Sequence, residues 1–167
     1  MKIGLISDTH SYLDEKVFQY FRDVDEIWHA GDIGTLSLLE QLEAFKPTVA
    51  VYGNIDDTSI QAAAPENQII VREGVKTLMT HIAGKPPKYN ARVKKLIKEH
   101  QPNLLICGHS HILKVQPDHE NNLLFMNPGA AGIHGFHQMK TLLRFDLENG
   151  KPKNLEVIEL GKRGALK

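Results

Sequence analysis

The sequence is poor in cysteine and contains no long hydrophobic run. Its one cysteine, Cys107, cannot form an internal disulfide, so nothing in the chain requires an oxidising compartment. No stretch approaches the roughly 20 consecutive apolar residues of a membrane-spanning helix, and the apolar start at residues 1–7 is too short for a signal peptide. We therefore expect a cytoplasmic protein that has no membrane partner.

An excess of charge of either sign is also absent. The chain has 20 lysine and arginine residues against 20 aspartate and glutamate residues. It therefore lacks the basic surface of a general nucleic-acid-binding protein, and any anion must be bound locally. Its 167 residues, of which 41% are hydrophobic, suffice for a packed core. Without a repeat or linker, we expect one domain, residues 1–167.

The first half of the sequence alternates between strand-like and helix-like segments. Short apolar stretches predict strands at residues 2–7, 26–30 and 47–52. Apolar residues at spacings of three and four predict amphipathic helices over 13–24 and 36–45. This βαβαβ order predicts parallel strands joined by right-handed crossovers.

The second half is dominated by hairpins. One helix is expected over 89–100, and Asn149-Gly150 is the clearest hairpin turn. The expected strands are 68–71, 77–81, 104–107, 113–117, 123–126, 141–147 and 155–160. We predict an α/β fold in which two mixed β-sheets pack face to face with helices outside, a four-layer αββα sandwich.

Five of the expected strands end in short polar motifs. These are "SDTH" with Asp8 and His10, "HAGD" with Asp32, "YGN" with Asn54, "MTH" with His81, and "CGHSH" with His109 and His111. Ligands of open α/β sheets collect at the carboxyl ends of strands, where the loops converge. Side chains two positions apart in an extended segment point the same way, so the first and last motifs are each expected to present two donors to one region.

The seven oxygen and nitrogen donors are too many for one tetrahedral ion, and a structural zinc site would be expected to include thiolates. They suit two divalent ions about 3.5 to 4 Å apart that share a carboxylate, an arrangement that activates water against phosphorus. Each motif alone has an ordinary explanation, because histidines at strand ends are often only hydrogen-bonded and "GD" and "GN" are common turns. The prediction depends on all five motifs recurring in order.

The ordered motifs "DTH", "GD", "GNID", "TH" and "GHSH", with a late "NPGA", resemble the calcineurin-like metallophosphoesterases. The resemblance covers residues 2–147 and is strongest to the small bacterial and archaeal members. It implies a fold of two sheets flanked by helices and hydrolysis of phosphodiester bonds by a hydroxide that bridges two metal ions. Two alternatives stay open: a phosphomonoesterase, or a catalytically weak protein-binding scaffold such as the small retromer subunit, which shares this fold.

The resemblance also implies a role for each donor. The first metal would be held by Asp8, His10 and His111, the second by Asn54, His81 and His109, and Asp32 would bridge them. The catalytic residues would be Asp32, Asn54 and His81. Two Mn²⁺ ions suit this donor set, with Zn²⁺, Fe or Ni²⁺ as alternatives.

One position departs from the wider family. Many members have histidine after the asparagine, where it is thought to protonate the leaving group, whereas this chain has Ile55. His134 and His137 are candidates to replace it and, with Asn54, to contact a small phosphodiester or phosphoester substrate. They are otherwise polar loop residues.

Further polar residues have two interpretations. Lys85 and Lys88 either meet substrate phosphate or belong to the solvated face of the following helix. Asp56 and Asp57 are expected to orient neighbouring groups. The loops 60–67, 83–89 and 132–138 are expected to set specificity, while the physiological substrate and any homo-oligomer cannot be read from the sequence.

Overall fold

The computed structural model describes residues 1–164. The helices are α1 (Lys16–Tyr20), α2 (Leu36–Phe45), α3 (Thr58–Ala63) and α4 (Ala91–His100). The strands of the first half are β1 (Lys2–Ile6), β2 (Glu26–His29), β3 (Thr48–Ala50), β4 (Asn67–Arg72) and β5 (Val75–Thr80). They are followed by β6 (Gly84–Lys85), β7 (Lys88–Tyr89), β8 (Leu104–Ile106), β9 (Leu113–Asp118), β10 (Leu123–Pro128), β11 (Met139–Glu148) and β12 (Lys151–Lys162). None of the helices described is long and apolar enough to cross a membrane.

The strands form two five-stranded mixed sheets and a small hairpin. The first sheet has the order β12-β11-β1-β2-β3, and the second has the order β4-β5-β8-β10-β9. Strands β1, β2 and β3 are parallel, as the βαβαβ pattern predicts. The predicted hairpins are also confirmed, because β4 pairs antiparallel with β5, β9 with β10, and β11 with β12.

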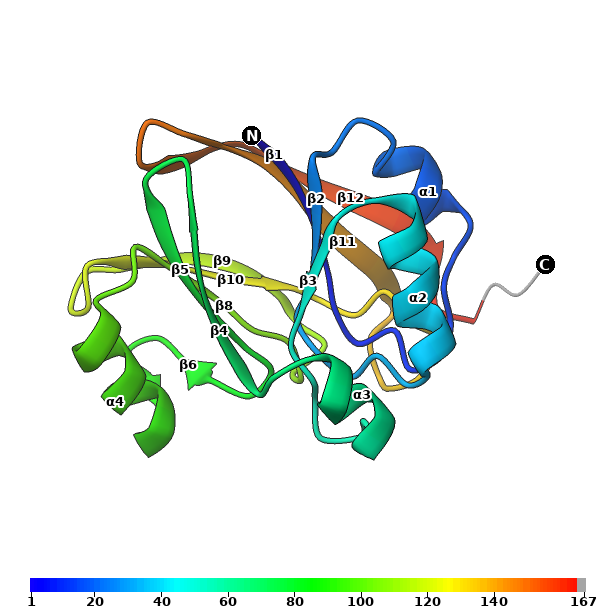
Figure 1. The fold of residues 1–167 in the computed structure, drawn as a ribbon, viewed down its shortest axis with the longest axis horizontal. Coiled ribbons are helices and arrows are strands. Elements are labelled where there is room, and N and C mark those ends of the chain that lie inside the picture. The colour runs from blue at the N-terminus through cyan, green and yellow to red at the C-terminus, as the bar shows by residue number, and fades with distance from the viewer. Residues whose placement is uncertain (165–167) are drawn as a thin grey trace.

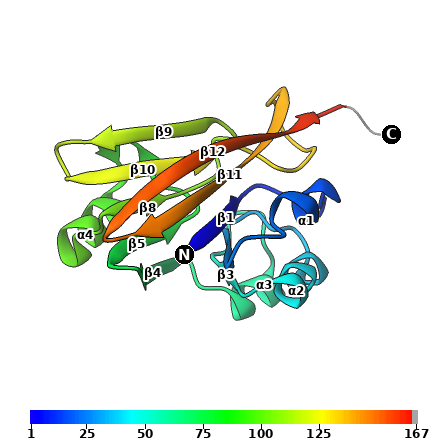
Figure 2. The ribbon, with the colours of Figure 1, turned by 90° about the horizontal axis from the view of Figure 1, so that it is seen from above.

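Four layers result from the way these sheets bury their apolar faces. One core cluster lies between the sheets, where Trp28 and Phe145 of the first sheet belong to the same cluster as Met79 and Ile106 of the second. A second cluster joins α1, α2 and α3 to the first sheet, and a third joins α4 to the second sheet. Figure 1 shows α1 and α2 on the opposite side of the molecule from α4, with both sheets between them, and Figure 2 shows the same arrangement from above. The predicted αββα sandwich is confirmed.

The helix predicted over 13–24 is wrong in length, because α1 spans only Lys16–Tyr20. After Tyr20 the chain forms tight turns, in which the N–H of Val24 donates to the Phe21 carbonyl three residues earlier. Phe21 and Val24 are nevertheless buried. The helical spacing therefore identified Val17, Phe21 and Val24 as buried, but it also placed Tyr20 on that face, and Tyr20 is exposed.

Two segments expected as loops contain secondary structure. Asp57 caps α3 by accepting hydrogen bonds from the N–H groups of Ser59 and Ile60 at 3.0 and 3.2 Å. Residues 84–89 form the β6–β7 hairpin, so the helix expected from residue 89 begins only at Ala91. Lys85 and Lys88 are therefore on this hairpin and not on the helix.

Candidate metal centre

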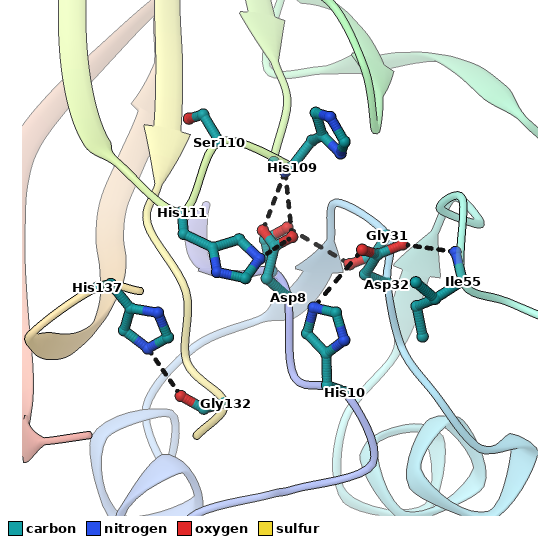
Figure 3. A network of polar contacts seen from close by, with 12 residues as sticks. Asp8, His10, Gly31, Asp32, Ile55, His109, Ser110, His111, Gly132 and His137 are labelled. Atoms are coloured by element: carbon teal, nitrogen blue, oxygen red, sulfur yellow. Dashed lines mark hydrogen bonds and ion pairs between the residues drawn. The ribbon is translucent and has the colours of Figure 1, made fainter. Parts of the chain in front are cut away.

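The five polar motifs converge where β1, β2, β3, β5 and β8 end. Figure 3 shows Asp8, His10, Asp32, His109 and His111 gathered at this place. The structure brings their acidic and imidazole side chains into two groups, and within each group the donor atoms lie within 4.8 Å of one another. The first group consists of Asp8, His10 and His111, and the second of Asp32, His81 and His109. Asn54 adjoins the second group, with its Oδ1 2.9 Å from Nδ1 of His109.

The carboxylate of Asp8 is the centre of the first group. It is fully buried, and its Oδ1 lies 3.2 Å from Nε2 of His111. The backbone N–H of His109 donates to both of its oxygens. The loop after β8 is thereby fixed to the loop after β1.

The carboxylate of Asp32 lies between the two groups. Its Oδ2 is 3.5 Å from Nε2 of His10, and its Oδ1 is 3.2 Å from Nε2 of His81. The backbone N–H of Ile55 also donates to Oδ1 at 3.1 Å. Within residues 1–164, Asp32 is therefore the side chain whose two oxygens face imidazoles of different groups.

The hydrogen bonds of His81 show that acceptor atoms face one another in the second group. Its Nδ1 lies 2.8 Å from the Ala30 carbonyl oxygen, which can only accept, so Nδ1 carries a proton. In the neutral ring, Nε2 then presents a lone pair to Oδ1 of Asp32 and, at 3.1 Å, to Oδ1 of Asn54. This repulsion is relieved only by a cation, either a proton on His81 or a metal ion.

The pKa values of the group follow from the same contacts. Burial disfavours the charged form of Asp32, but the hydrogen bond and charge of His81 outweigh it and lower the pKa of Asp32. Burial likewise disfavours charged His81, yet the hydrogen bond to Asp32 and the nearby carboxylates raise its pKa. The pKa of His10 is lowered, because its burial outweighs the attraction of Asp32 and Asp8. Asp32 is therefore held in its ionised form between the imidazoles of His10 and His81.

The backbone at the centre is left-handed. The expectation that the motifs are extended, with side chains two positions apart pointing the same way, is therefore wrong. Five donor residues have positive φ: Asp8 (54°), His10 (47°), Asp32 (54°), His109 (68°) and His111 (56°). Such conformations cost roughly 1 kcal/mol or more in residues other than glycine and cluster at functional sites. The two histidines of "CGHSH" consequently reach different groups.

Glycines leave the space that these side chains need. A Cβ on Gly53 would lie 2.1 Å from Oδ1 of Asp32, and one on Gly108 would lie 2.7 Å from Oδ2 of Asp8. A Cβ on Gly31 would lie 2.7 Å from Nδ1 of His81. The "GD", "GN" and "GH" pairs therefore have glycine for a steric reason.

Two further side chains hold the loops in place. Buried Asp56 accepts hydrogen bonds from the backbone N–H groups of Ile33, Gly34 and Gly53, and so joins the loops after β2 and β3. Asn127, to which the sequence reasoning assigned no role, donates to the Gly108 carbonyl at 2.7 Å. The sequence feature that could have indicated this role is the position of Asn127 at the start of an "NPG" segment, directly after a strongly apolar stretch.

A family model, the calcineurin-like phosphoesterase superfamily domain, matches residues 1–150. The chain belongs to this superfamily. The family is metal-dependent, and the donor set of the two groups, carboxylate, imidazole and carboxamide, fits divalent metal ions. Which of these atoms bind metal stays a prediction.

Curated relatives of this superfamily cover nearly the whole chain. A probable metallophosphoesterase of Methanothermobacter thermautotrophicus is 30% identical, over 96% of this chain and 94% of its own. A phosphodiesterase of Methanocaldococcus jannaschii is 27% identical, over 77% of this chain and 83% of its own. The chain is thus similar to small archaeal phosphoesterases along most of its length.

Solved structures of other proteins share the fold of this chain. An archaeal phosphodiesterase superposes with a TM-score of 0.76 at 24% identity, over 96% of this chain and all of its own. Vps29 of Entamoeba histolytica in complex with Zn²⁺ superposes with a TM-score of 0.71 at 17% identity, over 95% of this chain and 99% of its own. The fold therefore occurs both in a phosphodiesterase and in Vps29.

The other residues predicted for this phosphoesterase site lie at its edge. The ring of His134 is 5.1 Å from that of His10 and exposed. His137 packs behind His111, at 5.2 Å between ring centres, and its Nε2 donates to the Gly132 carbonyl at 2.9 Å (Figure 3). Burial lowers the pKa of His137. Of the two, His134 is the histidine with greater access to solvent.

Proposed function

We propose that this phosphoesterase is a dinuclear enzyme that hydrolyses phosphodiesters. The observation that carries the proposal is the position of Asp32, whose two carboxylate oxygens face imidazoles of two separate donor groups. A shared carboxylate between two sets of oxygen and nitrogen donors is the arrangement expected for a pair of divalent ions. The preference for diesters is supported by the curated phosphodiesterase among the relatives.

Each donor has an assigned position in this proposal. Asp8, His10 and His111 hold the first ion, Asn54, His81 and His109 hold the second, and Asp32 joins both. Mn²⁺ suits these donors, as do Zn²⁺, Fe and Ni²⁺. When bound, two such ions activate water as a nucleophile and stabilise charge on the phosphate oxygens.

The residues of the chain orient and shield the reaction. The hydrogen bond from His81 Nδ1 to the Ala30 carbonyl fixes the ring so that Nε2 faces the centre. Asn54, assigned to the second ion, is exposed and can also meet a substrate oxygen. Beside it, the side chain of Ile55 is 45% exposed and offers no proton to a leaving group. If the chain itself supplies a proton to the leaving group, the candidate donors are the histidines of the 132–138 loop, His134 and His137; otherwise bound ions would have to stabilise the leaving group.

The test compares an aryl diester with its monoester. Protein stripped with chelator and reloaded with Mn²⁺ is assayed with bis(p-nitrophenyl) phosphate and p-nitrophenyl phosphate. We expect metal-dependent hydrolysis with a higher kcat/KM for the diester. A higher value for the monoester would indicate a phosphomonoesterase, and metal binding without turnover of either would indicate a non-catalytic scaffold.

A further inference from the structure

A hollow of about 320 Å³ lies beside the candidate metal centre. The β6–β7 hairpin forms one wall through Lys85 and Lys88, and the loop after β8 forms the other through His109 and Ser110. We call it the hairpin hollow. Because His109 is also a donor of the second group, a molecule bound at that group has this hollow next to it. Figure 3 shows His109 and Ser110 next to each other on the loop after β8.

The hairpin hollow has positive charge without a compensating carboxylate. Neither Lys85 nor Lys88 forms an ion pair with any carboxylate of residues 1–164. No acidic side chain of the described chain lines the hollow. Two lysines therefore line a cavity that has no acidic side chain of the described chain, in a protein whose overall charge is balanced.

The two lysines are directly opposite each other in the hairpin. Lys85 pairs with Lys88 across β6 and β7. Like charges at directly opposite positions destabilise a strand pair, and opposite charges stabilise it. The arrangement is therefore unfavourable for the hairpin alone and becomes favourable when an anion lies between the ammonium groups.

The hairpin is held firmly enough to present these charges in a fixed place. Buried Tyr89 donates to Asp118 at 2.7 Å, and the N–H of Asn90 donates to the Ala83 carbonyl at 3.0 Å. Gly84 has φ of +91°, and a Cβ there would lie 2.9 Å from the Lys88 carbonyl oxygen. The opposite wall adds a donor, because Oγ of Ser110 accepts from Asn127 and Ile112 and its own hydrogen is free to donate.

A second hollow beside the centre differs in charge. It has a volume of about 140 Å³ and is lined by Asn54, His81 and Arg92. The guanidinium of Arg92 is already engaged by the Glu66 carboxylate and by the side chain of Thr80. Ile82 lines both hollows, so they flank the second donor group. Of these two hollows, the hairpin hollow is the one whose basic side chains form no ion pair within residues 1–164.

We propose that the hairpin hollow binds a second phosphate group of the substrate, through Lys85, Lys88 and Ser110. The inference rests on the proposed phosphodiesterase function and narrows its substrate class. Ammonium groups bind phosphate as point charges, and a hydroxyl donor adds direction to the contact. The preferred substrates are then diesters that carry a further phosphate near the scissile one.

Two matched substrates test this preference. They are the p-nitrophenyl ester of thymidine 5′-phosphate with and without a 3′-phosphate, both followed by release of p-nitrophenolate. We expect the 3′-phosphate to raise kcat/KM by about 5-fold or more, the effect of roughly 1 kcal/mol of added binding. In the double variant Lys85→Gln/Lys88→Gln, the ratio of kcat/KM with the 3′-phosphate to kcat/KM without it should be close to one. The control Lys94→Gln/Lys95→Gln, which removes two exposed lysines of α4, should leave it unchanged.

Direct binding separates this inference from the proposed function. Inorganic phosphate is titrated into metal-free, full-length protein while backbone amide signals are recorded by NMR. We expect the amides of Gly84 and Ser110 to shift in the wild type and in the α4 control, but not in the hairpin double variant. Equal shifts in all three proteins, or a substrate ratio near one in the wild type, would overturn the inference. Absence of turnover with both substrates alongside phosphate binding would instead contradict the phosphodiesterase function alone.

Discussion

The backbone N–H of His109 donates to both carboxylate oxygens of Asp8, with both distances 3.1 Å. The two residues follow β8 of the second sheet and β1 of the first. In the proposed assignment Asp8 serves one ion and His109 the other, so this contact couples the two donor groups. The centre is therefore complete only when the two sheets pack together.

Asp32→Asn should lower turnover more than any other single exchange at the centre. The variant keeps the shape of the side chain but loses the charge that would neutralise both ions. We expect kcat to fall by more than about 100-fold, the upper range for a residue that only orients a ligand. Metal content and rate are measured on the same samples, and a variant that retains two ions and most of the rate would show that Asp32 does not bridge them.

Ile55→His should reduce the dependence of the rate on the leaving group. Without a proton donor at this position, diesters with leaving groups of high pKa should react much more slowly than aryl diesters. General acid catalysis typically contributes about 10² to 10⁴ in rate. The measurement is a plot of log kcat against leaving-group pKa for wild type and variant, and the variant is expected to have the shallower slope.

The control for this plot is Ile55→Gln, which adds a polar side chain of similar size that is not an acid. Its slope should remain that of the wild type. A slope that is already shallow in the wild type would show that another residue donates the proton, with His134 and His137 as the first to exchange.

Asp56→Asn should destabilise the metal-free protein. Its carboxylate accepts three backbone N–H groups, and an amide would place its own N–H₂ against at least one of them. Leaving a buried donor unsatisfied costs about 1–3 kcal/mol. Urea unfolding measures the loss, with the exposed cap variant Asp57→Ala as a control that should lose less. An unchanged midpoint for Asp56→Asn would show that this hydrogen-bond network does not support the two loops.

Acid should destabilise the metal-free protein through His29. This buried ring accepts from the N–H of Gly31 and contacts Thr9 Oγ1 at 2.9 Å, and burial lowers its pKa to about 4. Since the unfolded value is near 6.5, the unfolded chain binds the extra proton between these values. Stability from neutral His29 is therefore present above about pH 6.5 and decreases by about 3 kcal/mol as the pH falls to 4.

Urea unfolding between pH 4 and 7, with chelator present, tests this slope. The variant His29→Gln should have a shallower dependence on pH than the wild type, whatever its stability at pH 7. Identical slopes for the two proteins would mean that His29 does not contribute to acid sensitivity.

Much of the fold follows from local patterns in the sequence. Apolar runs and turn residues are patterns of only a few consecutive residues. They correctly predict the strands of the two main sheets, the parallel pairing in the first half and the hairpins in the second. α1 is shorter than predicted, and α3 and the β6–β7 hairpin lie in segments that were expected to be loops. The limits of α1 depend on contacts distant in sequence. One such contact is the ion pair between Nζ of Lys140 and Oδ2 of Asp14, at 2.6 Å, just before α1.

The convergence of the five motifs was predictable, but their geometry was not. The carboxyl ends of parallel strands meet at one edge, so the donors could be expected together. Their left-handed backbone could not be read from "DTH" or "GHSH", since residues other than glycine rarely adopt it without tertiary support. The same limit applies to Lys85 and Lys88, because the paired hairpin is what shows that they lie opposite each other in one wall of a hollow.

The most direct test of a dinuclear phosphodiesterase is a metal titration of its rate. Protein stripped of metal is titrated with Mn²⁺ at a concentration well above the dissociation constants, and the initial rate of bis(p-nitrophenyl) phosphate hydrolysis is recorded at each addition. The account predicts a rate that rises to a plateau at two equivalents per chain. A plateau at one equivalent, or no hydrolysis at any ratio, would contradict it.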